Sequence, residues 1–173
     1  MSSGAAPGGP TQSNRGGGDA PTSDSPGVIA FPPLLFAIPF ASGALLELLM
    51  PIHILPHRLA LVLGAALAAV SVAQAAAAAA LMRRAGTEIN PMRPTTALVV
   101  TGPFRYTRNP LYVSLTGLYV GGALLLNALW PLLLLPVALL LVERGVIERE
   151  EAYLERKFGD AYRAYRARVR RWL

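Results

Sequence analysis

Long uncharged segments separated by polar connections are the main feature of this chain of 173 residues. The mostly apolar segment 28–52, which contains Glu47, and the uncharged segment 59–82 each have the length of one membrane crossing, because a helix needs about 20 apolar residues to span the hydrocarbon core. Prolines near the start of the first segment predict a helix that is kinked or begins late. The pattern therefore predicts two transmembrane helices joined by a short turn.

A third segment, residues 111–142, is uncharged over its whole length. One helix of 32 residues would be about 48 Å long, against a core of about 30 Å. Asn127 and Pro131 mark a possible turn, so we expect two short spans, over about 110–127 and 130–147, that form a hairpin. A single long tilted helix is the alternative interpretation.

Charged residues become frequent after Ile147, but apolar residues still recur at steps of three and four, which is typical of an amphipathic helix. Gly159 and Asp160 interrupt this pattern. We expect the last span to leave the bilayer and continue to Phe158. A short basic helix then follows from Ala161 and lies on the membrane surface. These C-terminal helices together cover about 148–172.

The composition supports this interpretation, since 53% of the residues are hydrophobic and only 15% are charged, against about a quarter in soluble domains. The absence of cysteine excludes disulfides, thiolate metal sites and a cysteine nucleophile. Residues 1–27 are rich in Gly, Ser, Pro and Thr and predict a disordered tail rather than a signal peptide. The sequence thus predicts an all-α, polytopic membrane domain over 28–173.

The basic residues indicate the topology, because they collect on the cytoplasmic side. Residues 83–110 carry five Arg and one Glu, and residues 143–173 carry eight Arg and one Lys against five Glu and one Asp. The two intervening turns hold one arginine between them. Four spans with both termini in the cytoplasm satisfy these counts. Abundant Ala and Arg suit a bacterium, and hence its inner membrane.

The sequence TGPFRYTRNPLY, from Thr101 to Tyr112, stands where the polar connection meets the third span. One interpretation is an interfacial collar, in which Asn109 is the N-cap and Pro110 the first residue of a helix. The other is an anion site, since free N–H groups at a helix start and nearby arginines attract negative charge. Physics alone leaves both open.

Glu150 and Glu151 form the second candidate, one to two turns above the end of the last span. They are either part of a solvated helix face with Glu–Arg pairs or a carboxylate pair that holds an ammonium group. A ligand with both a carboxylate and an ammonium group would bridge the two regions.

Together the two regions resemble the isoprenylcysteine carboxyl methyltransferases and the related phospholipid methyltransferases. The pattern G-x-x-R-Y-x-R-[HN]-P-x-Y is followed by a helical hairpin and then by E-E-x-x-L-x-x-x-F-G-x-x-Y-x-x-Y. The matching residues are Gly102, Arg105, Tyr106, Arg108, Asn109, Pro110 and Tyr112, and then Glu150, Glu151, Leu154, Phe158, Gly159, Tyr162 and Tyr165. Eukaryotic members have histidine at the position of Asn109 and commonly glycine at that of Ser114.

The resemblance implies an integral-membrane enzyme that uses S-adenosylmethionine and methylates a lipid-soluble acceptor, at a carboxyl group or an amine. It implies a cofactor site formed by Gly102, Tyr106, Asn109, Pro110, Tyr112, Glu150 and Glu151. Arg105, Arg108 and Asn109 are the implied catalytic residues, with an arginine holding a carboxylate or phosphate of the acceptor. Membrane lipids are the expected surroundings, and neither a metal site nor a nucleic-acid partner is expected.

Two other functions remain open, namely a membrane reductase with a nicotinamide cofactor and a non-catalytic membrane scaffold. Glu47 is either part of the site, as intramembrane carboxylates often are, or a residue near the outer surface. His53 and His57 are expected to be interfacial residues rather than a metal pair. The sequence does not indicate an oligomeric state.

Overall fold

Helices make up the whole framework of residues 26–173, which the computed structural model describes, and no strand occurs among them. The long helices are α1 Pro32–Leu49, α2 His57–Arg84, α3 Pro110–Leu125 and α4 Leu129–Val142. The shorter elements are the 3₁₀ turn η1 Gly102–Arg105, the π-helical turn η2 Glu143–Ile147, α5 Glu148–Phe158 and α6 Asp160–Arg166. The predicted all-α class is confirmed. The predicted disordered tail lies outside the described residues, except for Pro26 and Gly27.

Three helical stretches are long and apolar enough to cross a membrane: Pro32–Leu49, His57–Arg84 and the continuous run Leu129–Phe158. These fit an integral membrane protein. Pro110–Leu125 is apolar but shorter, so the count of four spans stays a prediction. The segment 111–142 is broken between α3 and α4. The predicted turn is therefore present, and the alternative of one long tilted helix is wrong.

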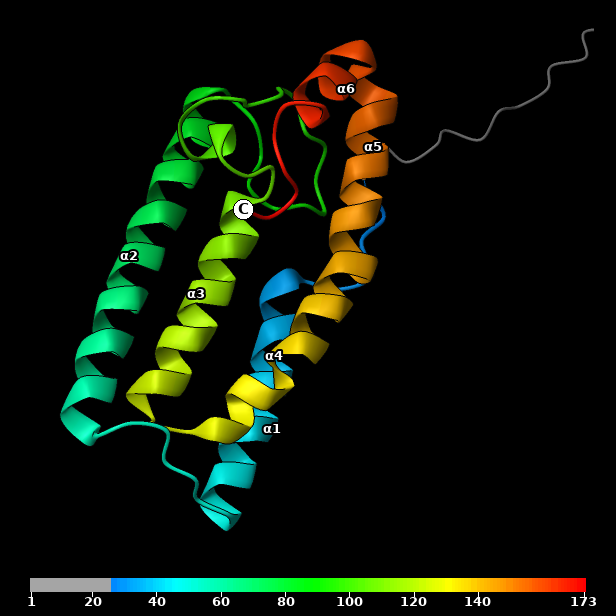
Figure 1. Ribbon diagram of the computed structural model, residues 1–173. Coiled ribbons are helices and arrows are strands. Elements are labelled where there is room, and N and C mark those ends of the chain that lie inside the picture. Colours follow the sequence, from blue (N-terminus) through cyan, green and yellow to red (C-terminus); the bar gives the residue numbers. More distant parts are fainter. Residues whose placement is uncertain (1–25) are drawn as a thin grey trace, which may run out of the picture.

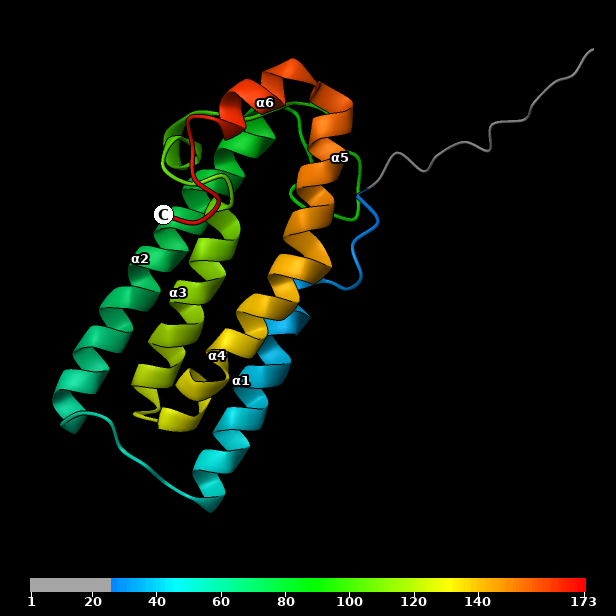
Figure 2. The ribbon, with the colours of Figure 1, turned by 45° about the vertical axis from the view of Figure 1, so that its right-hand side comes forward.

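Two helix pairs lie side by side, α2 against α3 and α1 against α4 (Figures 1 and 2). Small residues bring the first pair close together. A Cβ atom built on Gly64 of α2 would lie 2.8 Å from the carbonyl oxygen of Gly121 on α3. Close backbone approach of this kind is a common way for helices to associate in a membrane, where burial of apolar surface provides no driving force.

Asn127 and Glu47 hold the turns together at one end of the bundle. The Asn127 side chain accepts hydrogen bonds from the backbone N–H groups of Ile54 and Leu55, both at 3.1 Å. Glu47 accepts the backbone N–H of Leu129 at 3.0 Å, which satisfies a free donor near the start of α4. Glu47 thus joins the end of α1 to the start of α4 and lines neither of the cavities near the two motifs. That its end of the bundle faces the outside stays a prediction.

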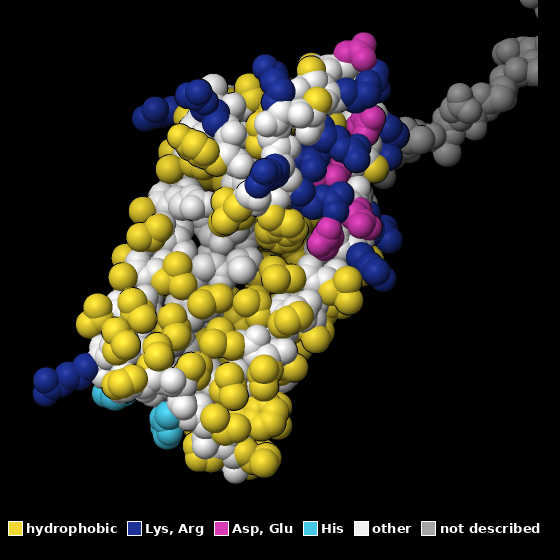
Figure 3. Space-filling view, viewed as in Figure 1, with side chains coloured by type: hydrophobic (Ala, Val, Ile, Leu, Met, Phe, Trp, Pro, Cys, Tyr) yellow, Lys and Arg dark blue, Asp and Glu magenta, His cyan; other side chains and the backbone are white. Residues whose placement is uncertain are grey.

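Charged side chains gather at the other end of the molecule, above a body covered by apolar side chains (Figure 3). This end is formed by α5, α6 and the connection between α2 and α3 (Figure 1). His53 and His57 lie at the end opposite to it, both exposed. The fold therefore brings both sequence motifs to one end, although they are about 40 residues apart in the chain.

Candidate functional site

Residues 102–109 of the arginine-rich motif form a compact loop, the arginine loop, that leads into α3. Gly102 begins η1 with a φ of +60°, a backbone conformation that favours glycine, and a Cβ atom there would also press on the end of the Leu81 side chain. Pro110 starts α3, and Asn109 is at its N-cap position, as predicted, but the Asn109 side chain makes no capping bond. Instead, Asn109 Nδ2 donates to the carbonyl oxygen of Arg171 at 3.0 Å. The loop is thereby tied to the end of the chain.

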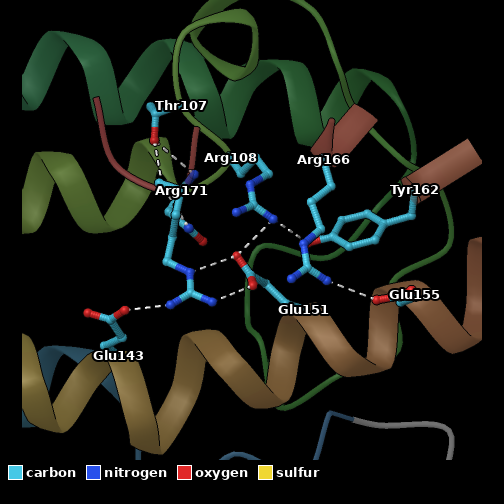
Figure 4. Close-up of polar contacts among 9 residues, drawn as sticks. Thr107, Arg108, Glu143, Glu151, Glu155, Tyr162, Arg166 and Arg171 are labelled. Atoms are coloured by element: carbon cyan, nitrogen blue, oxygen red, sulfur yellow. Dashed lines mark hydrogen bonds and ion pairs between the residues drawn. The ribbon is translucent and has the colours of Figure 1, made fainter. Parts of the chain in front are cut away.

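Glu151 stands at the centre of an ion-pair network that joins α5, the arginine loop and the C-terminus (Figure 4). Its carboxylate lies 3.1 Å from Arg108 Nη1 and 2.8 Å from Arg171 Nη2. The side chains of Glu151 and Arg108 are only 8% and 9% exposed, so this pair is shielded from water. Arg171 also pairs with Glu143, which η2 contributes. Glu151 is therefore already neutralised by two arginines.

Glu150 has different surroundings from its neighbour. Its Oε2 accepts a hydrogen bond of 2.9 Å from the hydroxyl of Tyr112, a buried residue of α3. The charge of Glu150 faces no arginine in the ion pairs of the network described above. Of the two adjacent carboxylates, Glu150 is thus the one better placed to hold a cation brought by a ligand.

Two cavities meet at these residues. The smaller one, of about 60 Å³, is lined by Arg108, Asn109, Glu150, Glu151 and Tyr162 among others. The larger one, of about 520 Å³, has walls formed mainly by apolar side chains from α1, α2 and α3. Both share Met82, Phe104, Arg108, Asn109 and Glu150. The two cavities therefore adjoin at these residues, and the charged side chains of Arg108 and Glu150 lie beside a wide, mainly apolar space.

Arg108 carries a donor that points to a missing partner. Among the buried side-chain nitrogen and oxygen atoms of residues 26–173, its Nε is the one without a hydrogen-bond partner. A buried donor without a partner is costly, and Arg108 lines both cavities. An anionic group bound in the cavity would satisfy this donor.

The structure brings most of the predicted site residues together. Arg108, Asn109 and Glu150 line both cavities, Glu151 lines the smaller one, and Pro110 and Tyr112 line the larger one. Arg105, Tyr106 and Gly102 line neither cavity and are exposed at the surface. A part for these three in catalysis or cofactor binding stays a prediction.

Arg171 is the residue of the network that the sequence did not single out. It lies in the basic run that ends the chain, where four arginines follow one another within six residues and look alike. The hydrogen bond with Glu151 raises the pKa of Arg171 above its usual value, so the side chain stays charged. Only the return of the chain to α3 distinguishes this arginine from its neighbours.

Two tyrosines of the second motif complete the charged end. Tyr165 donates a hydrogen bond of 2.7 Å to the carbonyl oxygen of Phe104, and burial raises its pKa to about 12. Tyr162 is almost fully buried next to Arg108, and burial raises its pKa as well. Both hydroxyls therefore stay protonated at neutral pH. Their hydrogen bonds with Arg108 and Phe104 hold α6 against the arginine loop.

Comparisons with known proteins agree with the resemblance noted in the motifs. Residues 59–161 match the family model of the phospholipid methyltransferases. An uncharacterized protein of Haemophilus influenzae is 54% identical over 37 residues, which are 21% of this chain and 59% of that protein. The chain thus spans about 59% of the length of this curated relative. No solved structure matches. Because the family model covers more than half of its residues, the chain belongs to the phospholipid methyltransferase family.

Proposed function

We propose that this protein is an integral-membrane methyltransferase that uses S-adenosylmethionine and acts on a lipid-soluble acceptor. The observation that carries the proposal is a wide, mainly apolar cavity whose wall includes Arg108, Asn109 and Glu150, next to a smaller cavity that shares these residues. A polar methyl donor and an apolar acceptor need charged side chains and an apolar wall within one site. Membership of the phospholipid methyltransferase family supports the same conclusion.

The described residues fit the cofactor. S-adenosylmethionine carries a carboxylate, an ammonium group and a positively charged sulfur. The buried Nε of Arg108 has no partner and offers a donor to an anion. The carboxylate of Glu150 lines both cavities and offers an acceptor to a cation. In this proposal Glu150 and Glu151 hold polar groups of the cofactor, while Asn109, Pro110 and Tyr112 line its surroundings.

When bound, S-adenosylmethionine supplies a methyl group that a nucleophile takes from the sulfur. The protein orients the acceptor and excludes water, which are the contributions expected where no covalent intermediate is needed. A carboxylate acceptor is already nucleophilic at neutral pH. An amine acceptor must first lose a proton, and Glu150, held by Tyr112 at 2.9 Å, is a carboxylate of the cavity that can accept it.

The apolar cavity explains why we expect the acceptor to come from the membrane. Phe31 and Pro33 at the start of α1 and Leu111, Leu115 and Leu118 of α3 lie along its wall. A lipid chain could lie against this wall while its polar end reaches Arg108. A water-soluble acceptor would have no use for such a surface.

The experiment is to incubate membranes that contain the protein with methyl-labelled S-adenosylmethionine and to separate lipids from water-soluble products. We expect label in the lipid extract, absent without the protein. Release of the label as methanol by mild base indicates a carboxyl methyl ester, and resistance indicates N-methylation. Label only in the aqueous fraction would refute a lipid-soluble acceptor. Binding of NADPH instead of S-adenosylhomocysteine by the purified protein would favour a reductase, and binding of neither would favour a scaffold.

The same proposal places the site at the cytoplasmic face of a bacterial inner membrane. The charged end of the molecule, which holds both motifs, carries most of the arginines (Figure 3). Basic residues collect on the cytoplasmic side. Four spans with both termini inside follow if α3 crosses the membrane together with the three longer helices.

A further inference from the structure

The C-terminal strap, residues 167–173, follows α6 and returns to the start of α3 (Figures 1 and 2). The turn out of α6 is fixed by backbone hydrogen bonds from Arg168 and Val169 to the carbonyl oxygen of Tyr165, at 3.0 and 3.1 Å. Trp172 then packs against the hydrophobic core cluster that includes Tyr112 and Ile147. The strap is therefore held at both of its ends and passes beside the cavities.

The backbone of the strap bonds to three consecutive residues of the arginine loop. Arg108 N donates to the carbonyl oxygen of Arg170 at 2.9 Å. The hydroxyl of Thr107 and the side-chain amide of Asn109 both donate to the carbonyl oxygen of Arg171 at 3.0 Å. Asn109 lines both cavities, so the position of its side chain depends on the strap.

The side chain of Arg171 bonds to the second motif. Its Nε and Nη2 bond to the two carboxylate oxygens of Glu151 at 3.2 and 2.8 Å, and its Nη1 bonds to Glu143 (Figure 4). Such a bidentate pair fixes the orientation of the carboxylate as well as its charge. One residue thus sets the position of a side chain on each of the two motifs.

Resting on the proposed function, we propose that Arg171 is a positioning residue of the cofactor site, which holds Glu151 through its guanidinium and Asn109 through its carbonyl oxygen. The match to the family model ends at residue 161, so this role lies outside the matched region. Glu151 keeps Arg108 as a partner when Arg171 is removed, but it loses the bond that fixes both of its oxygens. The site would then bind its cofactor less tightly without unfolding.

The test is the equilibrium affinity of the purified full chain for S-adenosylhomocysteine, with thermal unfolding measured on the same samples. We expect Arg171→Gln to weaken binding by about tenfold or more, the size of a lost bond to a charged group. Arg171→Lys should restore part of the affinity, because lysine keeps the charge but not the planar fork. The control is Arg170→Gln, which removes an exposed neighbouring charge and keeps the backbone carbonyl; its affinity should equal that of the unchanged protein.

Glu143→Gln distinguishes a purely structural role of Arg171 from a role in positioning Glu151. It breaks the ion pair between Arg171 and Glu143 and leaves the pair between Arg171 and Glu151 intact. We expect it to weaken binding less than Arg171→Gln does. Equal losses of affinity and of thermal stability in these two variants would show a structural part only and overturn the proposal.

A second readout needs no cofactor. The chain has two tryptophans, so in a Trp130→Phe background the fluorescence of Trp172 reports on the strap alone. Arg171→Gln should shift this emission to longer wavelength as Trp172 leaves the core. Unchanged or tighter binding by Arg171→Gln would overturn the proposal while the proposed function stands. If the unchanged protein does not bind S-adenosylhomocysteine, the proposed function itself is refuted, and the role of Arg171 that rests on it is refuted as well.

Discussion

Adjacent residues Glu150 and Glu151 should respond differently to the same substitution. Glu→Gln at either position removes the charge and keeps the size of the side chain and its preference for a helix. Glu151 is 8% exposed and faces two arginines, whereas Glu150 faces the hydroxyl of Tyr112 and the cavities. Glu151→Gln should therefore lower stability as well as affinity, whereas Glu150→Gln should act on ligand binding alone.

The magnitude at position 151 follows from the burial of its partner. Arg108 is 9% exposed and already has one unpaired donor, so Glu151→Gln leaves a buried charge with less compensation. Breaking a buried ion pair from one side costs about 3–5 kcal/mol. At about 2–4 °C per kcal/mol for a protein of this size, the melting temperature should fall by roughly 6–20 °C.

The magnitude at position 150 follows from the loss of one charged hydrogen bond to the ligand. Such a bond contributes about 1.5–3 kcal/mol, or roughly 10- to 100-fold in affinity. The glutamine side chain still offers an oxygen to the Tyr112 hydroxyl, so the melting temperature should change little. The affinity for S-adenosylhomocysteine should nevertheless fall.

Glu155 is the matched control on the same helix. It is 34% exposed and pairs with Arg163 and Arg166 at the surface. Surface pairs of this kind contribute about 0–1 kcal/mol, so Glu155→Gln should leave both affinity and melting temperature nearly unchanged. The assays are calorimetric binding and thermal unfolding of the purified chain. Similar losses of stability in Glu150→Gln and Glu151→Gln would refute the different roles assigned to these two residues. Equal affinities in all three variants would show that the glutamates are only part of a solvated helix face.

Three further predictions follow from the same structure. Reporter fusions should read inside, outside, inside, outside and inside, in this order, at Gly27, Pro56, Gly86, Asn127 and Leu173; a cytoplasmic reading at the fourth position would refute the hairpin of spans. Tyr112→Phe keeps the buried ring but removes the hydrogen bond to Glu150. The affinity for S-adenosylhomocysteine should therefore fall about tenfold. An unchanged affinity would show that Glu150 does not need this bond. Burial raises the pKa of Tyr165 from 10.0 to about 12, so the stability it contributes is present below pH 10 and is lost as the pH rises to 12. Denaturant titrations should show this loss, and Tyr165→Phe should be less stable at neutral pH but lose less over that interval; an equal slope would contradict the assignment.

The sequence alone was sufficient for the helical architecture. Charge-free runs of 24 and 32 residues can satisfy their backbone groups in a bilayer only as helices. The break between α3 and α4 was predictable because one helix of that length exceeds the bilayer, and Asn127 and Pro131 mark its position, with Asn127 in the turn and Pro131 near the start of α4. The start of α3 at Pro110 was predictable because proline suits the first turn of a helix.

The candidate site was predictable only as a set of residues. The two motifs name Arg108, Asn109, Tyr112, Glu150 and Glu151, but they do not indicate which side chains meet. Two neighbouring glutamates look equivalent in the sequence. They point in different directions because successive residues on a helix are rotated by about 100°, and the packing of α5 against the strap and α3 decides what each one faces.

The part of Arg171 was decided by the tertiary structure alone. It depends on a chain reversal after α6 that brings residue 171 to the carboxylates of Glu143 and Glu151, 28 and 20 positions earlier. No periodicity connects residues at such separations, and four neighbouring arginines have the same chemistry. Which of them reaches these carboxylates is fixed by the anchoring of Trp172 against the core and by the backbone bonds to the arginine loop.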